Sequence, residues 1–296
     1  MNHGLREESA SEADLVVAHA RDAGLECIVE SIDCRGDGNL AAIARRRRQE
    51  ALLRVARASG CGLVATAHHA DDQLETVLAA LARGAGPRGW RGIHACRPLA
   101  DDVLLVRPFL TTPGVALRQL GRELGLESAD DPTNRDPRRL RGRLRQGVCR
   151  ELEAIFPGAS RRVAAAAEHA ELAGQAIDRW LDEVWGDPAC RTRPRPPLRS
   201  LPPLLVAAGL RRSLLALAPG LADRVTEAMC RQVAESVCDG EQAPRRWMWP
   251  DGFVVELTSE RLSLRPSEAP PRGRSKSDRT KGPDRTPPPP AASPRR

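Results

Sequence analysis

Short apolar runs alternate with longer segments of helical periodicity over the first 126 residues of the chain. The apolar runs predict strands over residues 25–33, 62–67 and 103–107. Helices are predicted between these runs, with caps, glycines or a proline at their ends, over residues 9–23, 39–59, 71–83 and from 112 onward. This alternation favours an α/β fold with a parallel sheet.

The pattern changes after residue 126. Further helices are predicted over residues 138–155, 160–184, 203–217 and 222–237, and strand-like segments over 246–266. Pro, Arg, Ser and Lys dominate from residue 267 onward, which is typical of disorder. We therefore predict four parts: a sheet domain over 1–126, a mainly helical connecting region over 127–190, a small α+β domain over 191–266 and a disordered basic tail over 267–296.

Composition narrows the class of protein. No apolar run reaches the length of a membrane span, and the polar N-terminus does not resemble a signal peptide. The eight cysteines are scattered without a C-x-x-C pair, which predicts reduced thiols in a cytoplasmic protein and no zinc ribbon. The net charge is +7, but residues 268–296 hold eight Lys/Arg against three Asp/Glu. Local clusters must therefore carry any argument for nucleic-acid binding.

Two carboxylates begin the helix predicted over residues 71–83. The apolar stripe of this helix consists of Leu74, Val77, Leu78 and Leu81. Asp72 and Glu75 lie three residues apart on another face, and the preceding strand brings both to the carboxyl edge of the sheet, where open α/β sheets bind ligands. The pair would suit a cationic ligand or a metal. The alternative is that acids simply favour a helix N-terminus.

Arginines gather in three further places. In "AAIARRRRQEALLRV", Arg47 and Arg48 lie near an apolar stripe and either need an anionic partner or extend into solvent. Residues 135–150 contain seven arginines and one aspartate, which favours contacts with nucleic-acid phosphates over a solvated helix face. The turn "RGAGPRGWRG" is either a phosphate-binding or base-stacking loop or a connector.

Four blocks in the same order resemble the tRNA(Ile)-lysidine synthases of the N-type ATP pyrophosphatase superfamily. They are "NHGLREES", "ARRRR", "ATAHHADDQLETVLAALARGAGPRG" and "RPFL" with "DDPTNRD" and "RGRLR". The match covers roughly residues 1–160, and the third block is the most specific. It implies a Rossmann-like sheet of the adenine nucleotide alpha hydrolase type.

The resemblance also implies a reaction. The family uses ATP, with Mg²⁺, to adenylate the C2 oxygen of a cytidine in the CAU anticodon of tRNA(Ile). The ε-amine of free L-lysine then displaces AMP to give lysidine. The implied lysine-binding residues are Arg48, Asp72 and Glu75. The implied nucleotide-binding residues are His3, Arg6, His68 and Arg141. The implied tRNA-binding residues are Arg83, Arg88, Arg143 and Arg145. A homodimer is left open.

One departure from the family is large. The family's S-G-G-x-D-S phosphate loop follows a first strand that normally precedes the segment matching residues 2–6, and no G-G occurs in this chain. A pyrophosphate cradle needs glycine-rich backbone amides. We therefore expect an N-terminally truncated sheet, no assignable catalytic aspartate or metal ligand, and no activity of the chain as written. The alternatives are a degenerate tRNA-binding protein and another tRNA-modifying ATP pyrophosphatase, although thiolation is disfavoured without C-x-x-C.

Overall fold

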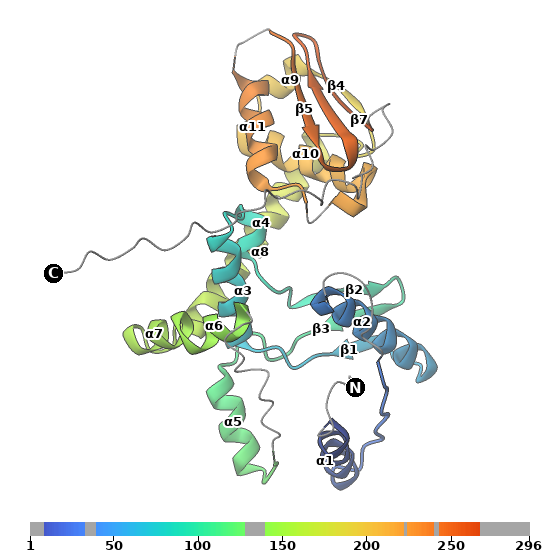
Figure 1. Cartoon of the computed structure of the whole chain (residues 1–296), viewed down its shortest axis with the longest axis vertical. Coiled ribbons are helices and arrows are strands. Elements are labelled where there is room, and N and C mark those ends of the chain that lie inside the picture. The colour runs from blue at the N-terminus through green and yellow to red at the C-terminus, as the bar shows by residue number, and fades with distance from the viewer. Residues whose placement is uncertain (1–8, 33–39, 128–139, 222–223, 240–242, 267–296) are drawn as a thin grey trace, which may run out of the picture. The chain divides into compact units, whose positions relative to one another are not determined.

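A computed structural model describes residues 9–32, 40–127, 140–221, 224–239 and 243–266 (Figure 1). The chain divides into two compact units, Met1–Gly186 with Thr226–Ala228, and Asp187–Val225 with Met229–Arg296. The predicted contacts His3 and Arg6 and the predicted tail lie outside the described residues, so they stay predictions. The predicted division into four parts also stays a prediction.

The first unit is an α/β assembly, as the alternating pattern predicts. Its elements are α1 Ser9–Asp22, α2 Leu40–Ala58, β1 Leu63–Ala65, α3 Ala70–Ala82, α4 Pro87–Trp90, β2 Cys96–Ala100, β3 Val103–Val106, α5 Gly114–Glu123, α6 Leu140–Gln146, α7 Val148–Ile155 and α8 Ala159–Val184. α2 and α3 end where Gly60 and Gly84 adopt φ of 66° and 70°, a left-handed conformation that glycine adopts without a Cβ penalty.

The sheet of this unit is mixed and has the strand order β1-β3-β2. β1 pairs parallel to β3, as predicted, whereas β2 pairs antiparallel to β3 and was not predicted. A helical wheel or an apolar run could not identify β2, since Pro98 interrupts a short, partly exposed segment. Val64, Val103 and Leu105 form the core of the sheet with Ala56 of α2, so α2 covers one face.

The strand predicted over residues 25–33 is wrong for its described part. Residues 25–32 form no strand beyond a single bridge at Ser31. Leu25, Ile28 and Val29 are 66%, 48% and 49% exposed, so the apolar run does not enter a core. Only Ile32 is buried, against Ala51 of α2. An apolar run becomes a strand only where a neighbouring strand pairs with its backbone, and local sequence cannot supply that partner.

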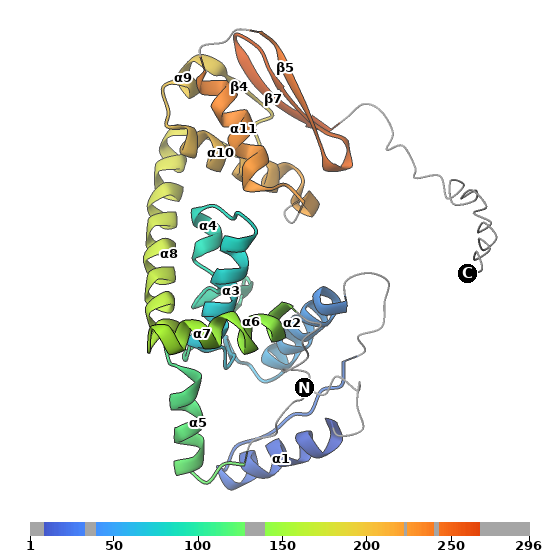
Figure 2. The same cartoon turned by 60° about the vertical axis from the view of Figure 1, so that its left-hand side comes forward.

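α3 and α4 pack on the long helix α8 (Figure 2). The buried face of α3 includes Leu74 and Val77, as predicted, but also Gln73 and Ala80. Leu81, predicted to face the core, is 49% exposed. The packing of α8 and α4 decides which face of α3 is buried. The centre of that buried face therefore differs from the centre of the apolar stripe that the sequence predicts.

The second unit combines helices with an antiparallel sheet of order β4-β7-β6-β5 (Figure 1). Its elements are β4 Thr192–Pro194, α9 Arg195–Arg199, α10 Pro203–Leu217, the 3₁₀ turns η2 Pro219–Leu221 and η3 Pro250–Gly252, α11 Glu227–Cys238, β5 Arg245–Trp249, β6 Phe253–Leu257 and β7 Arg261–Pro266. Arg195 is 1% exposed and donates to the carbonyls of Ser236 and Thr258. These hydrogen bonds offset part of the free-energy cost of burying its guanidinium.

Within the described residues, no helix combines the length and the apolar character that crossing a bilayer requires.

Candidate functional site

The turn after β1 positions the predicted acidic pair. His69 is the N-cap of α3, and its backbone N–H donates to Oδ2 of Asp72 at 3.0 Å. This contact is half of a capping box, which holds the Asp72 side chain over the first turn of the helix. Asp71 accepts from the backbone N–H of Gly114 at 3.2 Å and so ties α3 to the start of α5.

Asp72 and Glu75 share one cation. Arg145 of α6 donates through Nε to Oε1 of Glu75 at 2.5 Å and through Nη2 to Oδ1 of Asp72 at 3.2 Å. Glu75 is 1% exposed, the Asp72 side chain 18% and the Arg145 side chain 38%. The spacing of the two acids therefore does create a cation site, and the guanidinium of this chain lies in it.

Burial shapes the electrostatics of this site. Burial raises the pKa of Glu75, against the lowering effect of the hydrogen bond and charge of Arg145. Although burial opposes it, the hydrogen bond and charge of Glu75, followed by the charge of Asp72, raise the pKa of Arg145. Burial, with a smaller contribution from the charge of Glu75, raises the pKa of the nearby Cys149 thiol to about 11. The thiol is therefore protonated and unreactive near neutral pH.

His68 lies in a cationic neighbourhood. Its Nδ1 is 3.0 Å from Oγ1 of Thr66, and burial lowers its pKa, as do the charges of Arg107, Arg141 and Arg45. Asp72 opposes this shift. Neutral imidazole and several guanidinium groups suit an anion.

Arg107 was not predicted as a site residue. It is 5% exposed, donates to the carbonyl of His94 at 2.6 Å, and has a buried Nε without a hydrogen-bond partner among the described residues. The "RPFL" block marks its position in the sequence, but its burial could not be seen there.

The arginine run of α2 lies in solvent. Residues 45–48 are all exposed, and the side chains of Arg46 and Arg47 pair with Glu50 at 3.7 and 3.6 Å. For Arg47 the solvent-exposed alternative therefore holds. The assignment of Arg48 to a lysine pocket stays a prediction, because the described ion pairs of Asp72 and Glu75 are made by Arg145 and His69.

The predicted tRNA contacts lie in different settings. Arg83 is exposed at the C-cap of α3 and Arg143 is exposed on α6, as is Arg141, which was predicted as a nucleotide contact. Arg88 instead forms an ion pair with Asp178 of α8. Arg145 forms an ion pair with Glu75 and does not lie on an open surface. Of the predicted nucleotide and tRNA contacts that the structure describes, Arg83, Arg141 and Arg143 are therefore the arginines exposed to solvent.

Gln73 was not predicted as a site residue. It is 3% exposed, and its Nε2 donates to the carbonyls of Arg91 and Ile93 at 2.9 and 3.1 Å while Oε1 accepts from the N–H of Ile93 at 2.6 Å. Gly92 has φ of 63°, and a Cβ there would lie 2.5 Å from Oε1 of Gln73. The glycine-rich turn is therefore pinned to α3, as a connector would be.

The turn after β1 does not fit the phosphates of a nucleotide. A phosphate cradle needs several free backbone N–H groups. Here the N–H of Thr66 donates to Val106, that of His69 to Asp72 and that of Ala70 to Thr112. The described residues also contain no group of three or more His, Cys, Asp or Glu side chains arranged to hold a metal ion.

Comparisons with known proteins agree on the family. A family model described as PP-loop domain matches residues 1–152. A tRNA(Ile)-lysidine synthase from Novosphingobium aromaticivorans is 38% identical over 63% of this chain and 57% of its own length. Others from Alkalilimnicola ehrlichii and Methylobacterium sp. (strain 4-46) are 34% and 33% identical over 92% and 93% of this chain, and over 60% and 82% of their own lengths.

The match to the Methylobacterium protein extends over nearly the whole chain and most of the relative. The chain nevertheless spans only 57% and 60% of the Novosphingobium and Alkalilimnicola proteins. With the PP-loop match over half of its residues, the α/β fold and the acidic pair after β1, the chain belongs to the tRNA(Ile)-lysidine synthase family.

Proposed function

We propose that this chain serves in ATP-dependent tRNA modification, joining free L-lysine to C2 of the wobble cytidine of tRNA(Ile) with a CAU anticodon. In that reaction ATP would transfer AMP to the C2 oxygen and release pyrophosphate, and the ε-amine of lysine would then displace AMP, which leaves with that oxygen. The names of the relatives favour such an enzyme over a degenerate tRNA-binding protein. A cytoplasmic location belongs to the same proposal, as does Mg²⁺ as the ion accompanying ATP.

The observation that carries the proposal is the cation held by Asp72 and Glu75. Both carboxylates reach the guanidinium of Arg145, at 3.2 and 2.5 Å, although Glu75 is buried. A buried carboxylate is costly unless it is paired with a cation. The ε-ammonium group of lysine has the same charge and the hydrogen-bond donors to take over this role. The pair therefore suits the amine substrate.

Arg145 has a second consequence for this proposal. Its guanidinium bridges both acids, so lysine must displace it or share the carboxylates with it. Arg145 lies on α6, which also bears Arg141 and Arg143, two of the proposed nucleotide and tRNA contacts. Displacing Arg145 would thus release a guanidinium on the helix that bears the proposed RNA contacts, so the proposal couples lysine entry to RNA contact.

The acidic pair also has a role in proton transfer. Lysine binds best as the ammonium ion, but only the free amine is a nucleophile, so a proton must leave the ε-nitrogen. Burial raises the pKa of Glu75, and a carboxylate of raised pKa is a stronger proton acceptor. We assign the holding of the ammonium group to Asp72 and the acceptance of its proton to Glu75.

Calorimetric titration of the full chain with L-lysine tests the proposal. Asp72→Asn should weaken lysine binding by about 10- to 100-fold, because a charge-assisted hydrogen bond is lost. Asp71→Asn is the matched control: it removes the same charge from the same helical turn but not from the pair, and it should change lysine binding little. L-norleucine, which keeps the α-ammonium group but lacks the ε-ammonium group, should bind both forms equally weakly. If the two substitutions weakened lysine binding equally, Asp72 would only be a carboxylate that interacts with the helix dipole and not a lysine contact.

A further inference from the structure

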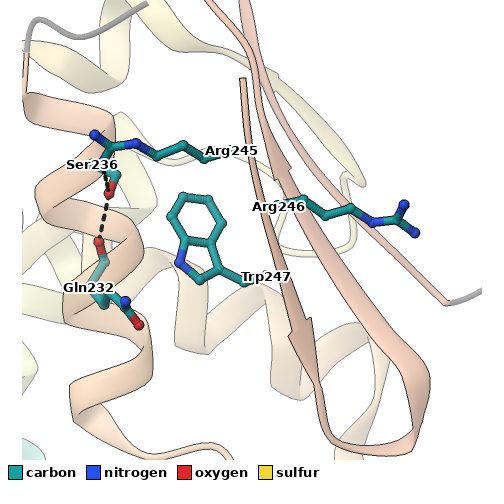
Figure 3. A pocket seen from close by; sticks show the side chains of 5 residues that line it. All are labelled: Gln232, Ser236, Arg245, Arg246 and Trp247. Atoms are coloured by element: carbon teal, nitrogen blue, oxygen red, sulfur yellow. Dashed lines mark hydrogen bonds between the residues drawn. The ribbon is translucent and has the colours of Figure 1, made fainter. Parts of the chain in front are cut away.

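A cavity of about 350 Å³ lies in the second unit, between α11 and β5 (Figure 3). It is lined by Gln232, Ser236, Arg245, Arg246 and Trp247. β5 is an outermost strand of its sheet, so the cavity lies at the sheet edge. None of these residues belongs to the acidic pair or to the predicted nucleotide and tRNA contacts.

Strand alternation explains why an indole faces this cavity. Arg245, Trp247 and Trp249 occupy one side of β5, and Trp249 is 5% exposed in the core of the unit. Trp247 is only half-buried, and Figure 3 shows its ring beside Gln232 and Ser236 of α11. Arg246 points to the other side of the strand, where it pairs with Glu256 at 3.5 Å.

The polar wall of the cavity is preformed. Arg245 donates through Nη1 to Oγ of Ser236 at 2.5 Å and to Oδ2 of Asp239 at 2.9 Å. The hydroxyl of Ser236 in turn donates to the carbonyl of Gln232 at 3.1 Å. Arg195, buried beneath, donates to the carbonyl of Ser236 at 2.9 Å. Arg245 and Ser236 are therefore fixed before any ligand arrives, which lowers the entropy lost on binding.

Two groups in the cavity have hydrogen-bonding capacity to spare. Over the described residues, neither the indole N–H of Trp247 nor the side-chain amide of Gln232 makes a hydrogen bond. No carboxylate lines the cavity, and the nearby Asp239 is paired with Arg245. The site thus offers a flat aromatic face, an amide that can donate and accept, and a guanidinium. This set suits a planar, neutral or anionic ligand.

We propose that this cavity binds one unstacked nucleotide of an RNA, with the base on the indole of Trp247. The amide of Gln232 would meet the edge of the base. Aromatic stacking with hydrogen bonds to base edges is how unpaired RNA bases are bound. The inference rests on the proposed function, because it takes the RNA to be the tRNA substrate.

An RNA nucleotide fits the site better than a free nucleotide does. A free nucleotide of high affinity needs a cradle for its phosphates. Of the two arginines that line the cavity, Arg245 is already shared with Ser236 and Asp239, and Arg246 pairs with Glu256. Within an RNA, neighbouring residues of the same strand would bind elsewhere on the protein. The single base then needs only the stacking face and the edge contact.

Fluorescence anisotropy of the full chain with a short, labelled, single-stranded RNA and with a tRNA(Ile) transcript tests the proposal. Trp247→Leu should weaken binding about tenfold or more, while Trp247→Phe keeps an aromatic face and most of the affinity. Gln232→Ala, on the exposed side of α11, should weaken binding a few-fold and is expected to fold normally. The matched control is Met248→Leu, since Met248 is 60% exposed on the other side of the same strand.

Wild-type affinity in both Trp247→Leu and Gln232→Ala would overturn the proposal. The proposal would also be overturned if mononucleotides quenched the fluorescence of Trp247 at the same concentration as the RNA does. That result would indicate a site for free nucleotides. The fluorescence of Trp247 is the part of the emission that Trp247→Phe loses. If Trp247→Leu fails to fold, two other measurements test the proposal. They are the RNA affinity of Gln232→Ala and the quenching by RNA of the fluorescence that the wild-type chain has and Trp247→Phe lacks. Lysine titrations of the wild-type chain distinguish this proposal from the proposed function. If RNA binding depends on Trp247 but the chain does not bind lysine, the proposed function is wrong and the nucleotide site stands.

Discussion

The ion pair between Glu75 and Arg145 should couple more strongly than a surface pair of the same chemistry. Replacing Arg145 by Met removes the partner of Oε1 of Glu75, and the other oxygen, Oε2, is already buried without a hydrogen bond. The variant would therefore hold a carboxylate with neither oxygen paired, at a position that is 1% exposed. Glu75→Gln keeps the shape of the side chain and removes its charge.

The magnitude follows from burial. Breaking a fully buried pair costs about 3–5 kcal/mol, but the Arg145 side chain is 38% exposed, so water can solvate part of the site left behind. We expect Arg145→Met to lower the free energy of unfolding by about 2 kcal/mol and Glu75→Gln by about 1 kcal/mol, since Arg145 keeps Asp72. The double variant should lose about 1.5 kcal/mol less than the sum of the two.

Urea unfolding of the four forms, followed by circular dichroism, measures this coupling. The matched control is the cycle for Arg57 and Asp102, which pair through two hydrogen bonds of 2.9 and 2.7 Å with both side chains 54% exposed. Solvent screening should make the control coupling much smaller. Equal coupling in the two cycles would mean that burial does not strengthen the Glu75 pair, and the reasoning would be wrong.

The pH dependence of Arg145→Met gives the sign of the effect. Burial raises the pKa of Glu75 in the folded protein, and the loss of Arg145 removes the main opposing contribution. A raised carboxyl pKa means that the folded state binds the proton more tightly than the unfolded state does. The stability deficit of Arg145→Met should therefore be largest above the folded pKa of Glu75 and shrink as the pH falls below it. A deficit that grows at low pH would contradict this assignment.

Two further changes test the supports of the site. Gln73→Leu should lower the free energy of unfolding by about 2–3 kcal/mol, because the N–H of Ile93 and two carbonyls lose a buried partner; urea unfolding checks this, and a loss near zero would show that the clamp is dispensable. Glu153 accepts the N–H groups of residues 158–160 at the start of α8, and these bonds lower its pKa although burial opposes them. The stabilisation by Glu153 is thus present above the ordinary pKa of Glu and is lost as the pH falls through the lowered pKa of the folded state. Glu153→Gln should therefore lower the free energy of unfolding by about 1 kcal/mol at neutral pH and leave it unchanged in acid. Thermal melts across pH measure this difference. A pH-independent cost would contradict the carboxylate's role.

Local signals located most helices of this chain. α2 and α3 lie within a residue or two of their predicted bounds, because glycine stops and apolar periodicity act over a few neighbouring residues. The predicted helix over residues 138–155 is instead two, α6 and α7, with Gly147 between them. The short β2 was missed, and residues 25–32 were wrongly predicted as a strand, since pairing depends on segments far away in sequence.

The spacing of Asp72 and Glu75 predicted the acidic half of the site. An i, i+3 separation puts two side chains on one face of a helix whatever the rest of the fold does. Their cation could not be predicted in the same way, because Arg145 is 70 residues from Glu75 in sequence. Arg145 was instead predicted as a tRNA contact, since an arginine-rich helix gives no sign of which guanidinium turns inward.

The sequence by itself determined the family of this protein, the positions of most of its helices and the acidic pair, because motif spacing, caps and periodicity are short-range properties of the chain. Tertiary structure alone decided that Arg145 bridges the two acids, that Gln73 pins the glycine-rich turn, and that Trp247 faces a cavity of the second unit. Each of these depends on which distant element packs against which face, and burial then sets the strength of the contact.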